Sequence, residues 1–153
     1  MSADGGAGPA VPELIPVGEI TVQLGSSREY GTTRVGERRV TPILGGVVQI
    51  LDSGGALPPV MAEILPGGAD WQRVRPDGVI EIDARYEAVT PGGHGLILHV
   101  RGLRRVGPDG VYFRAGVTVE AGDASLAELE RVLLLVDGVR EAEQVRHTLY
   151  RVA

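Results

Sequence analysis

The side chains best suited to chemistry lie in the stretch LPGGADWQRVRPDGVIEIDARYEAVT, residues 65–90. Asp83 and Arg85 stand two residues apart in a segment of alternating polarity, so they project from one face of a strand. If that face lines the interior, the Arg85 guanidinium presents a planar fork to a carboxylate or enolate, and Asp83 orients it or moves a proton. Two structural alternatives stay open: solvated positions joined by a weak ion pair, or a buried pair that ties strands together.

The same stretch places Asp70, Trp71 and Gln72 directly after a Gly-Gly turn. In a functional interpretation Asp70 is a general base, Trp71 is a wall at the mouth of a pocket, and Gln72 contacts the substrate. In the structural alternative Asp70 accepts hydrogen bonds from turn amides, and Trp71 closes one end of a barrel. Tyr86 is a further acid–base candidate, although its parity puts it on the apolar face of its strand.

A second group of candidates follows later in the chain. Tyr112 and Arg114 share a strand face, and Glu120 has the same parity if the strand is unbroken. Such a set could polarise a carbonyl group and shuttle a proton, whereas ordinary cross-strand pairing is the structural alternative. His99, in the middle of a strand pattern, is a candidate substrate contact.

Several kinds of site are not expected. No two of the three histidines have the spacing of metal ligands and cysteine is absent, so we expect no metal. The glycine-rich segments do not open a helix after a strand, which argues against a nucleotide loop or a nucleophile elbow, so we expect no cofactor. The net charge of −5, with no lysine, argues against nucleic acid as a partner.

Length and composition indicate one domain of many short strands. The 153 residues include 23 glycines and 10 prolines, with no apolar run near eighteen residues and no secretory signal at the start. We therefore expect a cytoplasmic protein that does not span a membrane. The Gly-, Ala- and Pro-rich residues 1–12 predict a disordered or loosely attached arm, and residues 13–153 a single domain.

Strand patterns separated by turns recur every ten to fifteen residues or so, which favours an antiparallel barrel or sandwich. Residues 26–40 are expected to be a polar connection, and the strand pattern of 38–51 is expected to break at Pro42 and at Gly45-Gly46. Residues 123–135 could form a helix, but their later part could equally be a buried strand. Strand patterns cover residues 18–25, 38–51, 60–68, 78–90, 96–106, 111–122 and, on both sides of a turn expected at Asp137-Gly138, 131–152.

The motifs LPGGADWQ, DARY with Thr90 after it, YFR and YRV occur in this order from about Val17 to Val152. Together they resemble the family called domain of unknown function 3237, a UPF0311-like group of small bacterial and fungal proteins. The resemblance implies a single antiparallel β-barrel. Together with the residue patterns above, it leads us to expect a barrel that is either all-β or carries one short helix near residues 123–132. It implies no settled reaction. The chain departs from the family pattern around Glu120 and at Leu126, Glu128 and Glu130, so a different ligand is expected if these positions line a pocket.

The leading hypothesis is a cofactor-independent enzyme that acts on a small carbonyl-bearing organic molecule by acid–base chemistry, as an isomerase, cyclase or lyase. The alternatives are a non-catalytic small-molecule-binding barrel and an oligomerisation or interaction module. Assembly into a homo-oligomer is compatible with all three. The residues predicted to carry catalysis are Asp70, Asp83, Arg85, Tyr86, Arg114 and Glu120, and those predicted to bind substrate are Trp71, Gln72, Tyr112 and His99.

Overall fold

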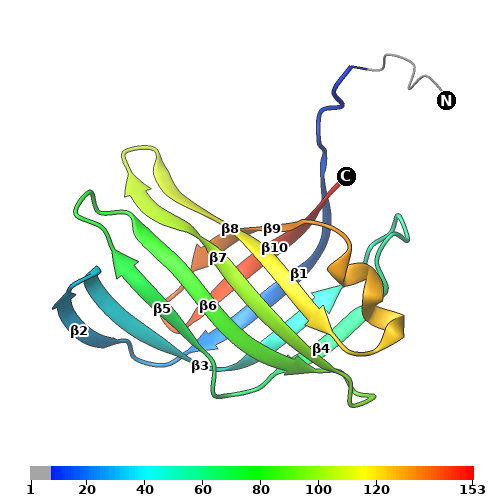
Figure 1. Cartoon of the computed structure of the whole chain (residues 1–153), viewed down its shortest axis with the longest axis horizontal. Helices are drawn as coiled ribbons and strands as arrows, with labels where there is room; N and C mark the ends of the chain where they lie inside the picture. Colours follow the sequence, from blue (N-terminus) through cyan, green and yellow to red (C-terminus); the bar gives the residue numbers. More distant parts are fainter. Residues whose placement is uncertain (1–7) are drawn as a thin grey trace.

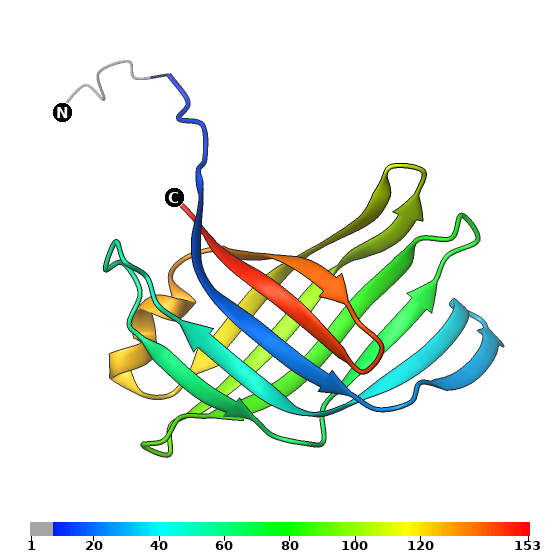
Figure 2. The same cartoon turned by 180° about the vertical axis from the view of Figure 1, so that it is seen from behind.

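Ten strands, most of them with alternating burial, pair into one antiparallel sheet that closes on itself. In the computed structural model, which describes residues 8–153, eight strands form a closed barrel with two extra strands and one short helix (Figures 1 and 2). The prediction of a single antiparallel barrel with one short helix is therefore confirmed. The elements in chain order are β1 (Leu14–Leu24), β2 (Arg28–Thr33), β3 (Gly36–Ile50), β4 (Val60–Ile64), β5 (Ala69–Val74), β6 (Ile80–Val89), β7 (Gly95–Gly107), β8 (Gly110–Ala121), the 3₁₀ helix η1 (Ala124–Glu130), β9 (Leu134–Arg140) and β10 (Gln144–Val152).

The strands follow one another around the barrel as β1, β10, β9, β8, β7 and β6. On its other side β6 pairs with both β4 and β5, and these two short strands pair in turn with β3. The pairing of β3 with β1 closes the cylinder, while β2 extends the sheet from β3. Because closure removes free sheet edges, nearly every strand presents one face to the interior and one to solvent.

The strand β3 corrects two predictions. Residues 26–40 are not a connection, because they form the hairpin of β2 with the first part of β3. The strand does not break at Pro42 or at the glycine pair. These residues lie where the pairing partners of β3 change: its first part pairs with β2 and β5, and its second part pairs with β1 and β4. Gly46 has a φ of 136°, and a Cβ atom there would lie 1.9 Å from the carbonyl oxygen of Thr21. Glycine thus allows β1 to approach, and the strand continues through the exchange.

The two ends of the barrel differ. The helix η1 lies at one end, and β2 and the β5–β6 and β7–β8 hairpins extend from the other (Figure 1). Leu126 and Leu129 of η1 are buried in the apolar core, which fills the end of the barrel beside the helix. No helix of the described residues is long and apolar enough to cross a membrane. Of the predicted N-terminal arm, residues 1–7 lie outside the described residues, and residues 8–12 are exposed without regular structure.

Candidate functional site in the barrel interior

The end of the barrel opposite η1 is hollow. A cavity of about 170 Å³ lies between the last residues of β1, β7 and β9 and the first part of β3, β6, β8 and β10. Its apolar wall includes Ile80, Ile82 and Phe113, and its polar lining includes Asp70 and Gln72. Small-molecule sites prefer such barrel mouths, where an apolar wall surrounds a few polar groups.

Asp70 is the carboxyl group of the cavity and is only 8% exposed. The registered pairs of β5 and β6 stop at Asp70–Ala84 and resume at Arg73–Glu81. In this gap the backbone N–H of Asp83 donates to Asp70 Oδ1 at 2.9 Å. A side-chain oxygen thus replaces a backbone acceptor, which fixes the carboxyl group against the wall of the barrel.

Gln72 connects Asp70 to a guanidinium group. It alternates with the exposed Trp71 and therefore faces inward beside Asp70. Its Nε2 donates to Asp70 Oδ2 at 2.8 Å, and its Oε1 accepts a short hydrogen bond from Arg39 Nε. Burial raises the pKa of Asp70, against the lowering effects of the hydrogen bonds from Gln72 and Asp83 and of the Arg39 charge. The Asp70 carboxylate is therefore a stronger base than that of an exposed aspartate.

Three arginines line the same cavity: Arg39, Arg104 and Arg140. Among the described residues none of the three forms an ion pair with a carboxylate. Burial and then the charges of Arg140 and Arg39 lower the pKa of Arg104, which shows that the three groups act on one another. Arg140 donates to the carbonyl oxygens of the turn between β9 and β10, which holds it at the rim. The cavity therefore has three positive groups against one carboxyl.

Two buried polar side chains also line the cavity without a partner. Tyr86 is 3% exposed and His147 is 5% exposed, and neither the Tyr86 hydroxyl nor either His147 nitrogen has a hydrogen-bond partner among the described residues. Burial raises the pKa of Tyr86 and lowers the pKa of His147 to about 4, so both side chains are neutral near pH 7. The Phe113 ring meets His147 edge-on, with centroids 5.5 Å apart. Because unpaired buried polar groups are rare, these atoms are natural contacts for a ligand.

Of the ten residues predicted from sequence, the structure brings three together in the cavity: Asp70, Gln72 and Tyr86. Asp83 and Arg85 lie on the opposite face of β6, which is the outer surface of the barrel. Asp83 pairs there with His99 Nε2 at 2.6 Å.

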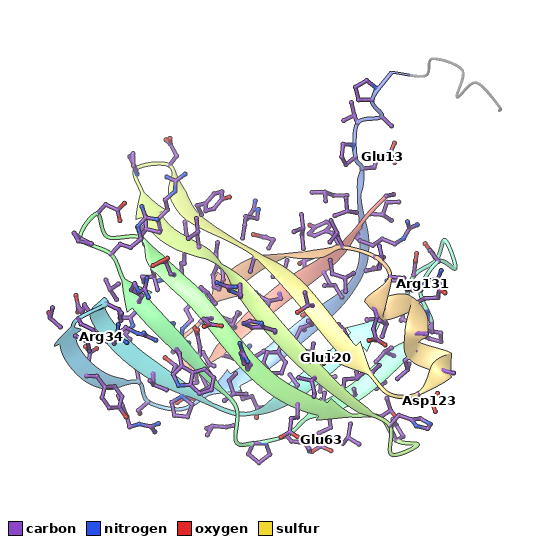
Figure 3. The ribbon with its side chains drawn as sticks, viewed as in Figure 1. Glu13, Arg34, Glu63, Glu120, Asp123 and Arg131 are labelled. Carbon is purple, nitrogen blue, oxygen red and sulfur yellow. The ribbon has the colours of Figure 1, made fainter. Side chains whose placement is uncertain are left out.

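Four further candidates also lie outside the cavity. Trp71 is 40% exposed, and it borders a shallow groove on the outer face rather than the mouth of the barrel. Tyr112 and Arg114 lie on the outer face of β8, where Arg114 pairs with Asp137. Glu120 lies on the same strand near η1, at the other end of the barrel (Figure 3).

The positions where the chain departs from the family pattern are also remote from the cavity. Leu126 packs into the core from η1, and Glu128 and Glu130 are exposed on that helix. None of the three, nor Glu120, lines the cavity. These departures therefore do not alter the cavity wall.

Sequence reasoning missed Arg39, Arg104, Arg140 and His147. The sequence does contain an indication of these residues, because each lies an even number of positions from buried residues of its strand and therefore faces the interior with them. Arg104 follows Leu98 and Val100 at even spacing, as Arg140 follows Leu134 and Val136, and His147 lies between Val145 and Leu149. A charged residue that continues an apolar stripe to the end of a strand indicates a polar barrel mouth.

The comparisons with known proteins agree with this architecture. A UPF0311 protein from Bradyrhizobium diazoefficiens is 30% identical over 140 residues, which cover 82% of this chain and 87% of that protein. The crystal structure of a conserved protein of unknown function from Rhodopseudomonas palustris superposes with a TM-score of 0.84 at 28% identity, over 95% of this chain and 100% of that chain. An enzyme from Penicillium herquei shares the fold, with a TM-score of 0.71 at 16% identity, over 97% of this chain and 99% of that chain. The family described as "Protein of unknown function (DUF3237)" matches residues 12–152, and the chain belongs to that family.

Proposed function

We propose that the barrel cavity is an active site in which Asp70 transfers a proton of a small carbonyl-bearing organic molecule, without a cofactor. The observation that carries this proposal is the position of Asp70: a buried carboxyl group with a raised pKa, held by two hydrogen bonds. It lies in a cavity where, among the described residues, the Tyr86 hydroxyl and both His147 nitrogens have no hydrogen-bond partner. Acid–base catalysis needs such a group, poised between its two protonation states.

The step that this arrangement supports is proton abstraction next to a carbonyl group. The Asp70 carboxylate takes the proton from the carbon, and the electron pair of the broken C–H bond forms an enolate. The Tyr86 hydroxyl donates a hydrogen bond to the enolate oxygen, which stabilises the negative charge that develops there. Return of the proton from Asp70 to another carbon of the conjugated enolate completes an isomerisation. In a cyclisation the enolate carbon instead forms a bond to a second carbonyl carbon of the same molecule, the π electrons of that carbonyl move to its oxygen, and the resulting alkoxide takes the proton from Asp70.

The fold adds limited support. One neighbour in structure, from Penicillium herquei, is called an enzyme, but at 16% identity the likeness extends to the fold alone. The proposal therefore depends on the residues of the cavity. A binding protein without catalysis would share the cavity and would not need the acid–base behaviour of Asp70.

The test is exchange of carbon-bound hydrogen for deuterium in D₂O, followed by proton NMR on a panel of small cyclic ketones and keto acids. We expect the wild-type protein to accelerate exchange next to the carbonyl group of at least one compound. Asp70→Asn should slow this exchange by about 100-fold or more, because it removes the base. Asparagine keeps an oxygen that accepts the N–H of Asp83, so the local fold should persist.

The matched control is Asp83→Asn, which removes a carboxylate from the outer face of the same wall. Exchange in this variant should equal that of the wild type. Loss of exchange in Asp83→Asn with retention in Asp70→Asn would move the site to the outer surface. Absence of exchange across the panel, with ligand binding retained, would leave a binding barrel in place of the enzyme.

A further inference from the structure

We propose that the ligand of this cavity is a small monocyclic organic acid: its carboxylate binds the arginines at the mouth, and an oxygen function on the opposite side of its ring meets Tyr86 and His147 at the floor. The inference rests on the proposed function for the location of the site, and it adds the chemical class of the molecule. It follows from three parts of the cavity that differ in chemistry: the mouth, the middle and the floor.

The mouth selects a negative charge. Arg39, Arg104 and Arg140 line it, while Asp70 carries the only carboxyl group among the described residues of the cavity lining. Arg39 is connected to Asp70 through Gln72, whereas Arg104 and Arg140 have no carboxylate partner among the described residues. The Nε of Arg104 is buried and has no hydrogen-bond partner. Guanidinium groups bind carboxylates through paired N–H donors, so a carboxylate at this position would satisfy both charge and hydrogen bonding.

The middle of the cavity selects a ring. Its wall is formed by aliphatic side chains from several strands and by Phe113, with the small residue Ala84 leaving open space. The volume of about 170 Å³ is close to the roughly 150 Å³ at which an apolar protein cavity accepts benzene. A single ring therefore fits in the cavity.

The floor selects an uncharged oxygen. Tyr86 and His147 are neutral and carry unpartnered polar atoms: a hydroxyl group and two ring nitrogens. A neutral imidazole offers one donor and one acceptor, so the pair can both donate to and accept from a hydroxyl or carbonyl group. A carboxylate at the floor would face two neutral side chains within a largely apolar surround, where burial of a charge is costly. The acid group therefore faces the mouth, and the oxygen function faces inward.

Three probes separate these layers: 4-hydroxybenzoate, its neutral analogue 4-hydroxybenzamide, and benzoate, which lacks the hydroxyl group. We would measure their dissociation constants by isothermal titration calorimetry in low salt. We expect 4-hydroxybenzoate to bind at least about tenfold more tightly than 4-hydroxybenzamide, as the loss of a charge-assisted hydrogen bond implies. Benzoate should also bind more weakly than 4-hydroxybenzoate, and Tyr86→Phe should reduce that difference.

Arg104→Gln should weaken 4-hydroxybenzoate binding by about tenfold or more and leave 4-hydroxybenzamide binding nearly unchanged. The matched control is Arg105→Gln, the next residue of β7, which faces outward over the Tyr112 ring and should bind as the wild type does. Arg140→Gln, at the exposed rim, provides a second loss of charge if Arg104→Gln proves poorly folded.

Equal binding of the acid and the amide, or full affinity in both arginine variants, would overturn the proposal. Failure of all three probes to bind, together with Asp70-dependent exchange on neutral ketones, would also overturn the ligand class and leave the proposed function intact. Charge-selective binding without any exchange activity would support the ligand class and count against the catalytic role. The two proposals therefore fail separately.

Discussion

Burial acts in opposite directions on two ionisable side chains of the cavity. It raises the pKa of Asp70 and lowers the pKa of His147, because in both cases the low-dielectric interior disfavours the charged form. Asp70 retains hydrogen bonds that stabilise its ionised form, whereas His147 has none. The first is therefore suited to moving a proton, and the second to remaining a neutral hydrogen-bonding group.

The burial of His147 predicts a dependence of stability on pH. Its pKa falls from its usual 6.5 to about 4 in the folded protein, so between these pH values the unfolded chain binds a proton that the folded protein does not. Its contribution is fully present above pH 6.5 and is lost as the pH falls toward 4. The difference corresponds to about 3 kcal/mol. Urea unfolding of the wild type and of His147→Gln at a series of pH values would measure it, with the variant losing less stability across this range.

Asp70 acts in the opposite sense, because a raised folded pKa favours the folded state as the pH falls. Both proteins contain Asp70, so the comparison isolates the histidine. Parallel curves for the wild type and His147→Gln would show that water or rearrangement already solvates the imidazole.

At the residue scale, the sequence alone indicated part of the lining of the cavity. The motif around Asp70 and Gln72 and the pattern of β6 indicated residues that do line the cavity. The pattern also paired Asp83 with Arg85 on one face, and period two alone left open whether that face was interior. The face of β6 that carries Tyr86 is apolar along most of its length. The arginines that face it across the cavity come from other strands. Closure of the barrel brings these strands together, so the sequence of β6 alone does not indicate a polar cavity.

At the scale of elements, the cavity depends on how β8, β9 and β10 approach one another. Gly138 of β9 lies over the Phe113 ring: a Cβ atom there would come within 2.7–2.9 Å of ring carbons. His147 of β10 is registered opposite Gly138 and meets the same ring edge-on. The missing side chain at Gly138 therefore sets the position of Phe113, which in turn forms the wall of the cavity.

Gly138→Ala should destabilise the protein by about 1–3 kcal/mol, because the added methyl group overpacks against Phe113. Phe113→Leu should suppress part of this loss, so that the double variant is more stable than the sum of the two single effects predicts. Chemical denaturation of the four proteins gives this coupling. The control is Gly116→Ala on β8, where the nearest atom would lie 4.0 Å from the new Cβ. Strict additivity would show that the ring moves freely and that Gly138 does not fix it.

The order of strands was harder to predict than their existence. Alternation correctly indicated the segments of β1, β4, β6, β7 and β8. The β2–β3 hairpin was missed because its residues are exposed and polar on both faces, which gives no periodic signal. The exchange of partners along β3 depends on contacts with four other strands, and local propensity at Pro42 therefore indicated a break that pairing overrides.

At the scale of the whole molecule, stability and the candidate site lie at opposite ends of the barrel. The end covered by η1 is filled with apolar side chains, while the other end holds a cavity with three arginines. The chain has a net charge of −5, and yet this cavity is positive. The overall charge argued against nucleic acid as a partner. It did not indicate which small molecule fits the cavity, because that depends on a few inward-facing residues.

This separation predicts that one arginine of the cavity costs stability. Arg104 lacks a carboxylate partner among the described residues, its Nε is buried and unpaired, and the charges of Arg140 and Arg39 oppose its own. Arg104→Met keeps the length of the side chain and removes the charge, so it should raise the free energy of unfolding, by at most about 1 kcal/mol because solvent screens this partly exposed group. Urea denaturation at low salt would measure the gain, which should shrink with added salt as the repulsion is screened. Arg105→Met, on the outer face of the same strand, should give no gain. If Arg104→Met loses as much stability as a core substitution does, Arg104 supports the wall of the cavity. If the variant gains stability and binds an organic acid more weakly, Arg104 favours ligand binding at a cost to the stability of the fold.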